Sequence, residues 1–260
     1  MQSRSPKVAC MSPQVPRKVN LICIPYAGGS ASAFAGWAKK FPLSDVNIVP
    51  LELPGRGFRF SQPLLTDFED ALEDMSGQLA ALETAPHVLF GYSLGGLIAW
   101  ELARRQVKCG NSGLKALVVA ACGAPGTARD RQLHLLSDND LVARIDEIDG
   151  GSYCSEAFKM PAIRQSVLPV LRADFSLAAS YRDKSNASIN LPLHVFYSDT
   201  DLHVSVEAAE AWRERTQYAI RRTGIAGGHF FLWSNQAEFL TVLDGALWEM
   251  IMQSDVKGEQ

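Results

Sequence analysis

The sequence lacks the signatures of several common classes of protein. No apolar run approaches the length of a membrane-spanning helix, so we expect no membrane association. The five cysteines form no C-x-x-C pair, and no histidine and cysteine cluster has zinc spacing. Neither G-x-G-x-x-G nor G-x-x-x-x-G-K occurs, so the fingerprints of nucleotide binding are absent.

The charge and the cysteines exclude further classes. The chain has 25 lysines and arginines against 28 aspartates and glutamates, a net charge of −3 without a basic cluster, so we expect no nucleic-acid partner. The cysteines are odd in number and unpatterned. Cys23 and Cys122 lie in apolar runs, where a thiol packs as a small hydrophobe. A reduced, cytoplasmic setting fits this usage best.

Length and apolar content bound the domain organisation. The chain has 260 residues, 47% of them hydrophobic, which is enough for one sizeable core. Residues 1–18 are polar, contain prolines and lack the apolar core of a signal peptide, so we expect a flexible leader. We predict a single domain over residues 19–253 and a frayed tail over residues 254–260.

One stretch, residues 88–98, organises the rest of the interpretation. It reads VLFGYSLGGLI: an apolar strand, a sharp G-x-S-x-G turn and the start of an amphipathic helix. This order is typical of the nucleophile elbow of α/β-hydrolases. Ser93 would occupy the tip of the turn, with Gly91 and Gly95 where a Cβ would collide with neighbouring elements. We therefore predict that Ser93 is a nucleophile.

An earlier strand also ends in a glycine-rich turn. The apolar run over residues 19–25 leads into YAGGS at residues 26–30, and apolar residues at helical spacing follow. In a nucleotide-binding fold such a turn binds phosphate, whereas in a hydrolase its backbone binds the oxyanion. We favour the oxyanion role, with the Ala27 N–H as donor and Tyr26 as second choice. The other donor would be the N–H of Leu94, the residue after the nucleophile.

The order of elements predicts the fold. Strand and helix patterns alternate to about residue 121, which implies a mostly parallel central sheet flanked by helices. The alternation breaks between Cys122 and about Asn190, where two helical patterns precede the next strand. We therefore predict an α/β-hydrolase fold with a helical lid insertion over about residues 128–185. Its apolar faces would line an acyl channel or pack on the core, and we favour the channel.

A serine hydroxyl needs a base, and the chain order in this fold is serine, acid, histidine. Two of the five histidines precede the region of the acid, and His194 lies within a predicted strand. His203 is two positions from Asp201, too close to lie opposite it across a site. His229 follows the last predicted strand in a glycine-rich loop, so we predict that it is the base.

The carboxylate partner of the histidine is expected just after the predicted strand that ends at Tyr197. Asp199 and Asp201 both qualify, although aspartate also favours turns for structural reasons. We favour Asp201, which would fix the tautomer of His229 and stabilise its imidazolium. The predicted catalytic set is therefore Ser93, Asp201 and His229, and this chemistry needs no metal or organic cofactor.

Taken together, the motifs of residues 20–248 resemble those of type II thioesterases, free-standing hydrolases that accompany polyketide synthases and nonribosomal peptide synthetases. The motifs are PYAGGS at 25–30, LPGRG at 53–57, GYSLGG at 91–96, SDNDL at 137–141, LPVLRADF at 168–175, AWR at 211–213 and GHFF at 228–231. The LPVLRADF run separates this family from generic esterases. Where the family usually has histidine and methionine around the serine, this chain has Tyr92 and Leu94, and Leu202 replaces the common proline after the acid.

The resemblance implies a function and partners. It implies hydrolysis of aberrant or stalled acyl groups from the phosphopantetheine arm of acyl or peptidyl carrier proteins, through an acyl-serine intermediate. The phosphopantetheine belongs to the substrate. We expect a monomer that receives the carrier protein on the lid and on the loop Leu53–Phe60. The alternatives are a carboxylesterase or lipase, a chain-releasing thioesterase, and an inactive hydrolase fold that serves as a binding partner.

Overall fold

A six-stranded sheet forms the centre of the computed structural model, which describes residues 19–41, 46–82, 85–127, 130–150, 154–183, 185 and 187–257. The leader expected over residues 1–18 lies outside this range. The strand order is β2-β1-β3-β4-β5-β6, and every neighbouring pair is parallel, which confirms the predicted α/β fold. The strands are β1 (Val19–Ile24), β2 (Val46–Pro50), β3 (His87–Tyr92), β4 (Leu114–Ala120), β5 (Leu193–Tyr197) and β6 (Arg221–Gly224).

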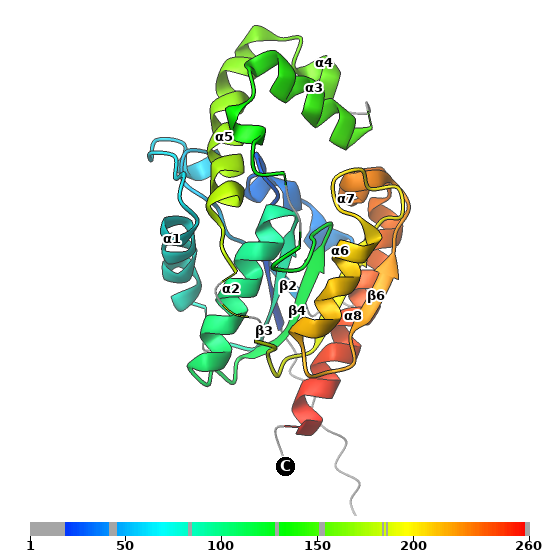
Figure 1. Ribbon diagram of the computed structural model, residues 1–260. Coiled ribbons are helices and arrows are strands. Elements are labelled where there is room, and N and C mark those ends of the chain that lie inside the picture. Colours follow the sequence, from blue (N-terminus) through cyan, green and yellow to red (C-terminus); the bar gives the residue numbers. More distant parts are fainter. Residues whose placement is uncertain are drawn as a thin grey trace, which may run out of the picture.

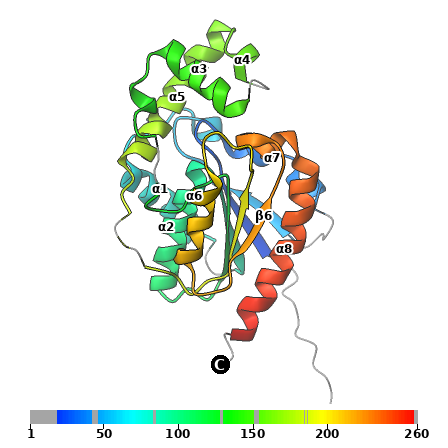
Figure 2. The same cartoon turned by 45° about the vertical axis from the view of Figure 1, so that its right-hand side comes forward.

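Helices cover both faces of the sheet (Figures 1 and 2). One apolar cluster joins the sheet to α1 (Phe68–Ala80), α2 (Leu94–Lys108), α6 (Val206–Glu210) and the 3-10 turn η5 (Ala211–Arg215). A second cluster joins the other face to η1 (Ala31–Phe34), η2 (Trp37–Lys39), α7 (Phe231–Ser234) and α8 (Gln236–Lys257). Since α8 extends to Lys257, residues 254–257, expected in a frayed tail, are helical.

The insertion between β4 and β5 forms a helical layer over the carboxyl ends of the strands, at the top of Figure 1. It comprises η4 (Leu133–Leu135), α3 (Asp138–Asp149), α4 (Cys154–Ala157) and α5 (Pro161–Ser180). These helices have a small apolar cluster of their own, which includes Leu141, Ile145 and Leu168. The carboxyl-terminal half of α5 descends beside α1, where the Phe68 N–H donates to Ser180 Oγ at 2.9 Å.

The topology determines where a site can form. β1 lies between β2 and β3. The connection after β1 therefore leads to the strand on one side of it, and the connection after β2 leads back to the strand on the other side. A crevice opens at the carboxyl ends of strands at such a switch point, because the connections diverge there. The turn after β1 and the turn after β3 therefore meet at one place. Within the described ranges, no helix is both long enough and apolar enough to cross a bilayer.

Candidate active site

Ser93 lies at the sharp turn between β3 and α2, as the elbow pattern predicts. Its backbone has φ 53° and ψ −116°, a conformation that non-glycine residues rarely adopt. A Cβ at Gly91 would collide with the Gly95 carbonyl group, and one at Gly95 would collide with the carbonyl oxygen of Ile24. The two glycines therefore let β3, α2 and β1 pack closely enough to hold the strained serine.

The structure brings the three predicted side chains together from the ends of three strands. His229, in η6 (Gly228–Phe230) after β6, has Nε2 3.1 Å from Ser93 Oγ. Its Nδ1 lies 2.8 Å from Asp201 Oδ2, and Asp201 follows β5. The side chains of His229 and Asp201 are 3% and 1% exposed. This is the geometry of a hydroxyl, a base and an orienting carboxylate, shielded from water on the acid's side.

Asp201 rather than Asp199 meets the histidine. Asp201 Oδ1 also accepts from the N–H groups of His203 at 2.7 Å and Val204 at 3.0 Å. Burial opposes ionisation of this carboxyl, but the hydrogen bond from His229 and these backbone donors outweigh it, so the pKa of Asp201 is lowered. The carboxylate is thus charged at neutral pH. Asp199 is exposed and makes no hydrogen bond to a described side chain.

A fully buried tyrosine ties the elbow to the histidine loop. The hydroxyl of Tyr92, the residue before the nucleophile, donates to the His229 carbonyl at 2.6 Å. It also accepts from the Leu232 N–H at 3.3 Å. The backbone of His229 is therefore held by the strand that carries Ser93, which limits how far the imidazole can move from the hydroxyl.

The two predicted oxyanion donors line the same cavity as Ser93. The Leu94 N–H is one of the first N–H groups of α2, which have no acceptor within the helix. The Ala27 N–H lies in the turn after β1, and among the described residues neither N–H donates a hydrogen bond. Both groups are available to a negative oxygen formed beside Ser93.

The cavity beside Ser93 has a volume of about 540 Å³ and lies under the lid. It is lined on the apolar side by Leu94, Leu97, Leu133, Phe175 and Ala178. A narrower pocket of about 40 Å³ lies between the Ser93–His229 pair and lid residues that include Ile145, Leu171 and Phe175. The volume suits an acyl chain of moderate length, and the apolar lining agrees with the predicted lid-lined channel.

His203, set aside in the sequence analysis, also faces the site. It lines both pockets, and its ring centroid lies 5.0 Å from that of His229 in an edge-to-face arrangement. Burial, and next the charge on His229, lower the pKa of His203 to about 4. A neutral imidazole therefore forms part of the wall of the cavity at neutral pH.

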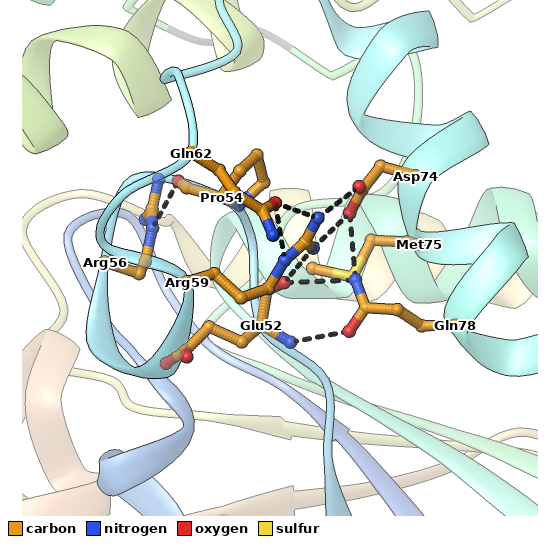
Figure 3. Close-up of polar contacts among 8 residues, drawn as sticks. All are labelled: Glu52, Pro54, Arg56, Arg59, Gln62, Asp74, Met75 and Gln78. Atoms are coloured by element: carbon orange, nitrogen blue, oxygen red, sulfur yellow. Dashed lines mark hydrogen bonds and ion pairs between the residues drawn. The ribbon is translucent and has the colours of Figure 1, made fainter.

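The loop Leu53–Phe60 after β2 is held rigidly (Figure 3). Arg59 donates to both carboxylate oxygens of Asp74 on α1, each at 2.6 Å, and to the Glu52 carbonyl at 2.7 Å. The Glu52 carboxylate accepts from the Phe58 N–H at 2.7 Å. On this fixed frame Phe58 is 94% exposed and Phe60 is 76% exposed. Exposed aromatic side chains on a rigid loop are typical of a contact surface.

Some contributors to the site carried no role in the sequence analysis. Tyr92, Arg56 and Asp174 all lie within motifs that resemble the family, yet composition and periodicity indicate nothing of their partners. The Tyr92 hydroxyl reaches a residue 137 positions away, and Arg56 pairs with a carboxylate 118 positions away. Among the described residues, no group of three histidine, cysteine, aspartate or glutamate side chains is arranged to hold a metal ion.

Comparisons with known proteins show to which family the chain is similar. The family model described as the Thioesterase domain matches residues 19–246. The chain is 34% identical over 225 residues to the gramicidin S biosynthesis protein GrsT of Aneurinibacillus migulanus, and the aligned region covers 86% of each chain. It is 33% identical over 229 residues to the thioesterase TesA of Mycobacterium marinum, covering 86% of this chain and 89% of that one.

Solved structures show the same relationship in three dimensions. The RedJ thioesterase of the prodiginine pathway in Streptomyces coelicolor superposes with a TM-score of 0.80 at 32% identity, covering 87% of this chain and 85% of that one. The type II thioesterase BorB of the borrelidin biosynthetic cluster has a TM-score of 0.80 at 32% identity, and the superposition covers 92% of this chain and 95% of that one. Both matches therefore include most of each chain.

Proposed function

The chain belongs to the thioesterase family, and from this premise we propose that it is a type II thioesterase that removes aberrant or stalled acyl groups from carrier proteins. The observation that carries the proposal is the hydrogen-bonded triad of Ser93, His229 and Asp201 at the wall of an apolar cavity. The relatives from gramicidin S, prodiginine and borrelidin biosynthesis support the setting of an assembly line.

In the proposed acylation step, Ser93 Oγ attacks the thioester carbonyl while His229 Nε2 takes the hydroxyl proton. The carbonyl oxygen becomes an oxyanion that accepts hydrogen bonds from the Ala27 and Leu94 N–H groups. The tetrahedral intermediate then collapses, the carbon–sulfur bond breaks, and His229 returns the proton to the departing pantetheine sulfur. Asp201 stays ionised and stabilises the imidazolium, because its lowered pKa keeps the proton on the histidine.

Deacylation uses the same groups with water as the nucleophile. A water molecule enters beside the acyl-serine, and His229 takes one of its protons as it attacks the carbonyl. Collapse of the second tetrahedral intermediate breaks the bond to Ser93 Oγ and returns the proton to it. The acid is released, and the carrier protein keeps its free thiol. Neither step needs a group beyond these side chains and backbone donors, so we propose that no cofactor takes part.

We further propose where the carrier protein binds and in what setting. Phe58 and Phe60 are exposed on the loop Leu53–Phe60, which Arg56 joins to the lid helix α5, and we assign this surface to the carrier protein. The pantetheine arm would then enter between the loop and the lid. Cys23 and Cys109 carry thiols outside any disulfide, which supports the cytoplasmic setting. We propose a monomeric enzyme, because one chain supplies every group that the reaction needs.

The experiment that tests this function follows acyl groups directly. Carrier proteins loaded with acetyl and longer acyl groups are incubated with wild type and with Ser93→Ala, and their masses are read by intact mass spectrometry. We expect wild type to restore the free thiol and the variant to lose at least about 10³-fold in rate. Ser166→Ala is the control, since this exposed hydroxyl on α5 bonds only to carbonyls of its own helix.

The same assay separates the rival functions. Simple oxyesters hydrolysed far better than acyl-carrier proteins would indicate a carboxylesterase. Hydrolysis of only a full-length product chain, with short acyl groups left in place, would indicate chain release. Wild type that leaves every acyl group untouched would overturn the proposal, as would Ser93→Ala that removes them at the wild-type rate.

A further inference from the structure

Two arginines three positions apart in the loop after β2 are used differently. Figure 3 shows Arg59 directed at Asp74 of α1 and Arg56 directed away from it. The Arg59–Asp74 pair is about one-fifth exposed on each side, and it fastens the loop to the outer layer of the molecule. Arg56 is only 7% exposed, and its guanidinium reaches the lid helix α5 instead. This contact between Arg56 and α5 lies against the turn after β1, which carries the proposed oxyanion donor Ala27.

The partner of Arg56 is Asp174, a fully buried carboxylate on α5. Asp174 Oδ1 accepts from Arg56 Nη2 at 2.7 Å, and Oδ2 accepts from Arg56 Nη1. Oδ2 accepts a further hydrogen bond, from the Gly28 N–H at 2.7 Å. Arg56 Nη1 also approaches the Gly29 carbonyl at 3.4 Å. The buried pair is thus bonded to two consecutive residues of the turn after β1.

That turn determines the direction of the Ala27 N–H. The Gly29 N–H donates to the Tyr26 carbonyl at 2.9 Å, and Gly28 has φ 79°, as the third residue of a type II turn requires. Because the peptide unit is planar and trans, the Ala27 N–H points opposite to the Tyr26 carbonyl. A rotation of the turn would therefore change the direction of the Ala27 N–H.

The lid helix α5 contacts the turn through two residues. Asp174 binds the Gly28 N–H, and Leu171, one helical turn earlier, packs so closely that a Cβ at Gly28 would collide with it. Pro169 precedes both residues inside α5, and it has no N–H for the helical ladder. Both contacts therefore come from the part of α5 that follows Pro169 and that packs beside α1.

We propose that Asp174, held by Arg56, is a positioning residue that keeps the Ala27 N–H aimed at the oxyanion. The inference rests on the proposed function, since it takes the Ala27 N–H as an oxyanion donor. Asp174 touches no reacting atom. It acts through the Gly28 N–H, so that the lid helix completes the oxyanion hole with a hydrogen bond rather than with a donor of its own.

The test uses small acyl-pantetheine thioesters, so that carrier docking plays no part. We expect Asp174→Asn to lower kcat by about 10-fold to 100-fold, less than the 10²–10³-fold that follows deletion of an oxyanion donor. The amide can accept at only one of the two carboxylate positions. KM should change less than about twofold, because the hole binds the transition state rather than the substrate. The inhibition constant of a trifluoromethyl ketone, which forms an oxyanion on Ser93, should rise by the same factor as kcat/KM falls.

A matched control separates positioning from stability. Asp183 forms a nearly as deeply buried ion pair with Arg215 at 2.9 Å, with the side chains 9% and 8% exposed. Asp183→Asn should lower the unfolding midpoint as Asp174→Asn does, yet leave kcat and the inhibition constant within about twofold of wild type. Breaking either buried pair leaves an unpaired charge, so both variants share the structural effect.

A double variant keeps the inference testable where the single variant folds poorly. Arg56→Met with Asp174→Leu removes both charges, so the unfolding midpoint should recover, whereas kcat should stay low because the Gly28 N–H still lacks an acceptor. Recovery of kcat together with stability would overturn the inference and leave the pair a purely structural role. Inactive wild type would instead overturn the proposed function, so the two failures are distinct.

Discussion

The site has a sheet side and a lid side, and they are built differently. On the sheet side, Ser93, Asp201 and His229 follow β3, β5 and β6, in a parallel sheet whose strands pair along their length. On the lid side, side chains of α3 and α5 line the narrower pocket beside Ser93 and His229, and a small apolar cluster holds these helices together. Much more apolar surface is buried in the clusters that cover the sheet than in the cluster of the lid.

This difference separates chemistry from selection. Reacting groups need positions constant to a fraction of an ångström, and paired strands supply them. A lid that excludes water and admits acyl chains of different size is better served by a thinly packed layer. Substitutions on the sheet side should therefore change the rate for every acyl group alike, and substitutions on the lid side should change the preference among acyl groups.

The largest effect is expected on the sheet side, at the carboxylate that orients the base. Asp201→Asn should lower kcat by about 10³–10⁴-fold for every acyl length, because an amide stabilises neither the required tautomer nor the imidazolium. Steady-state kinetics on an acyl series measures it. Asp199→Asn is the control and should retain wild-type rates, since Asp199 is exposed. A larger loss in Asp199→Asn would assign the acid to that residue.

A smaller uniform effect is expected at the bond between the elbow and the histidine loop. Tyr92→Phe leaves the buried His229 carbonyl without its 2.6 Å donor, so we expect about 1–3 kcal/mol lower unfolding free energy. We expect kcat to fall about tenfold at every acyl length as the imidazole moves. Tyr181→Phe, which removes a hydroxyl bonded to Glu101 at 2.9 Å, should lower stability without that loss. Equal loss of kcat in both variants would contradict the role of Tyr92.

On the lid side, one aromatic side chain should control acyl length. Phe175 lines both pockets beside Ser93, so Phe175→Ala should enlarge the space for the acyl chain. We expect kcat/KM to rise a few-fold for long acyl groups relative to short ones, a difference of about 1 kcal/mol. Leu135→Ala, on an exposed lid residue, is the control. A uniform fall over all lengths would place Phe175 in the chemistry instead.

The smallest effect on activity, but a clear one on stability, is expected within the sheet. Burial, and next the charge on Arg221, lower the pKa of His194 to about 4, below the ordinary 6.5. The fold thus favours the neutral imidazole, a stabilisation present above pH 6.5 and lost as the pH falls toward 4. We expect protonation of His194 to lower the free energy of unfolding by about 2 kcal/mol when the pH falls from 7 to 5.

His194→Phe should flatten that part of the pH dependence, because phenylalanine takes up no proton in the unfolded chain. Chemical denaturation of wild type and variant at pH 7 and pH 5 gives the comparison. A constant offset from the lost hydrogen bond to Thr223 is expected at both pH values. Two curves with the same slope would show that another group governs the acid limb.

The meeting of Ser93, Asp201 and His229 was predictable because all three residues follow the ends of strands. A parallel sheet brings the carboxyl ends of its strands to one edge, so residues in the loops after β3, β5 and β6 must meet there. The choice of Asp201 over Asp199 rested on preference alone, and the hydrogen bond to His229 supports it. His203 does not take the place of the base, since His229 bonds both Ser93 and Asp201, but its ring lies beside that of His229, which nothing in the sequence indicated.

The sequence by itself determined the parallel sheet, the elbow and the order of serine, acid and histidine, because periodicity and turn chemistry are local and strand ends converge by rule. Only the tertiary structure decided which side chains hold those groups in place. Arg56 meets Asp174, and Tyr92 meets the loop of His229, across more than a hundred residues of chain. Such partners depend on how helices and loops pack in three dimensions, and no spacing along the chain encodes that distance.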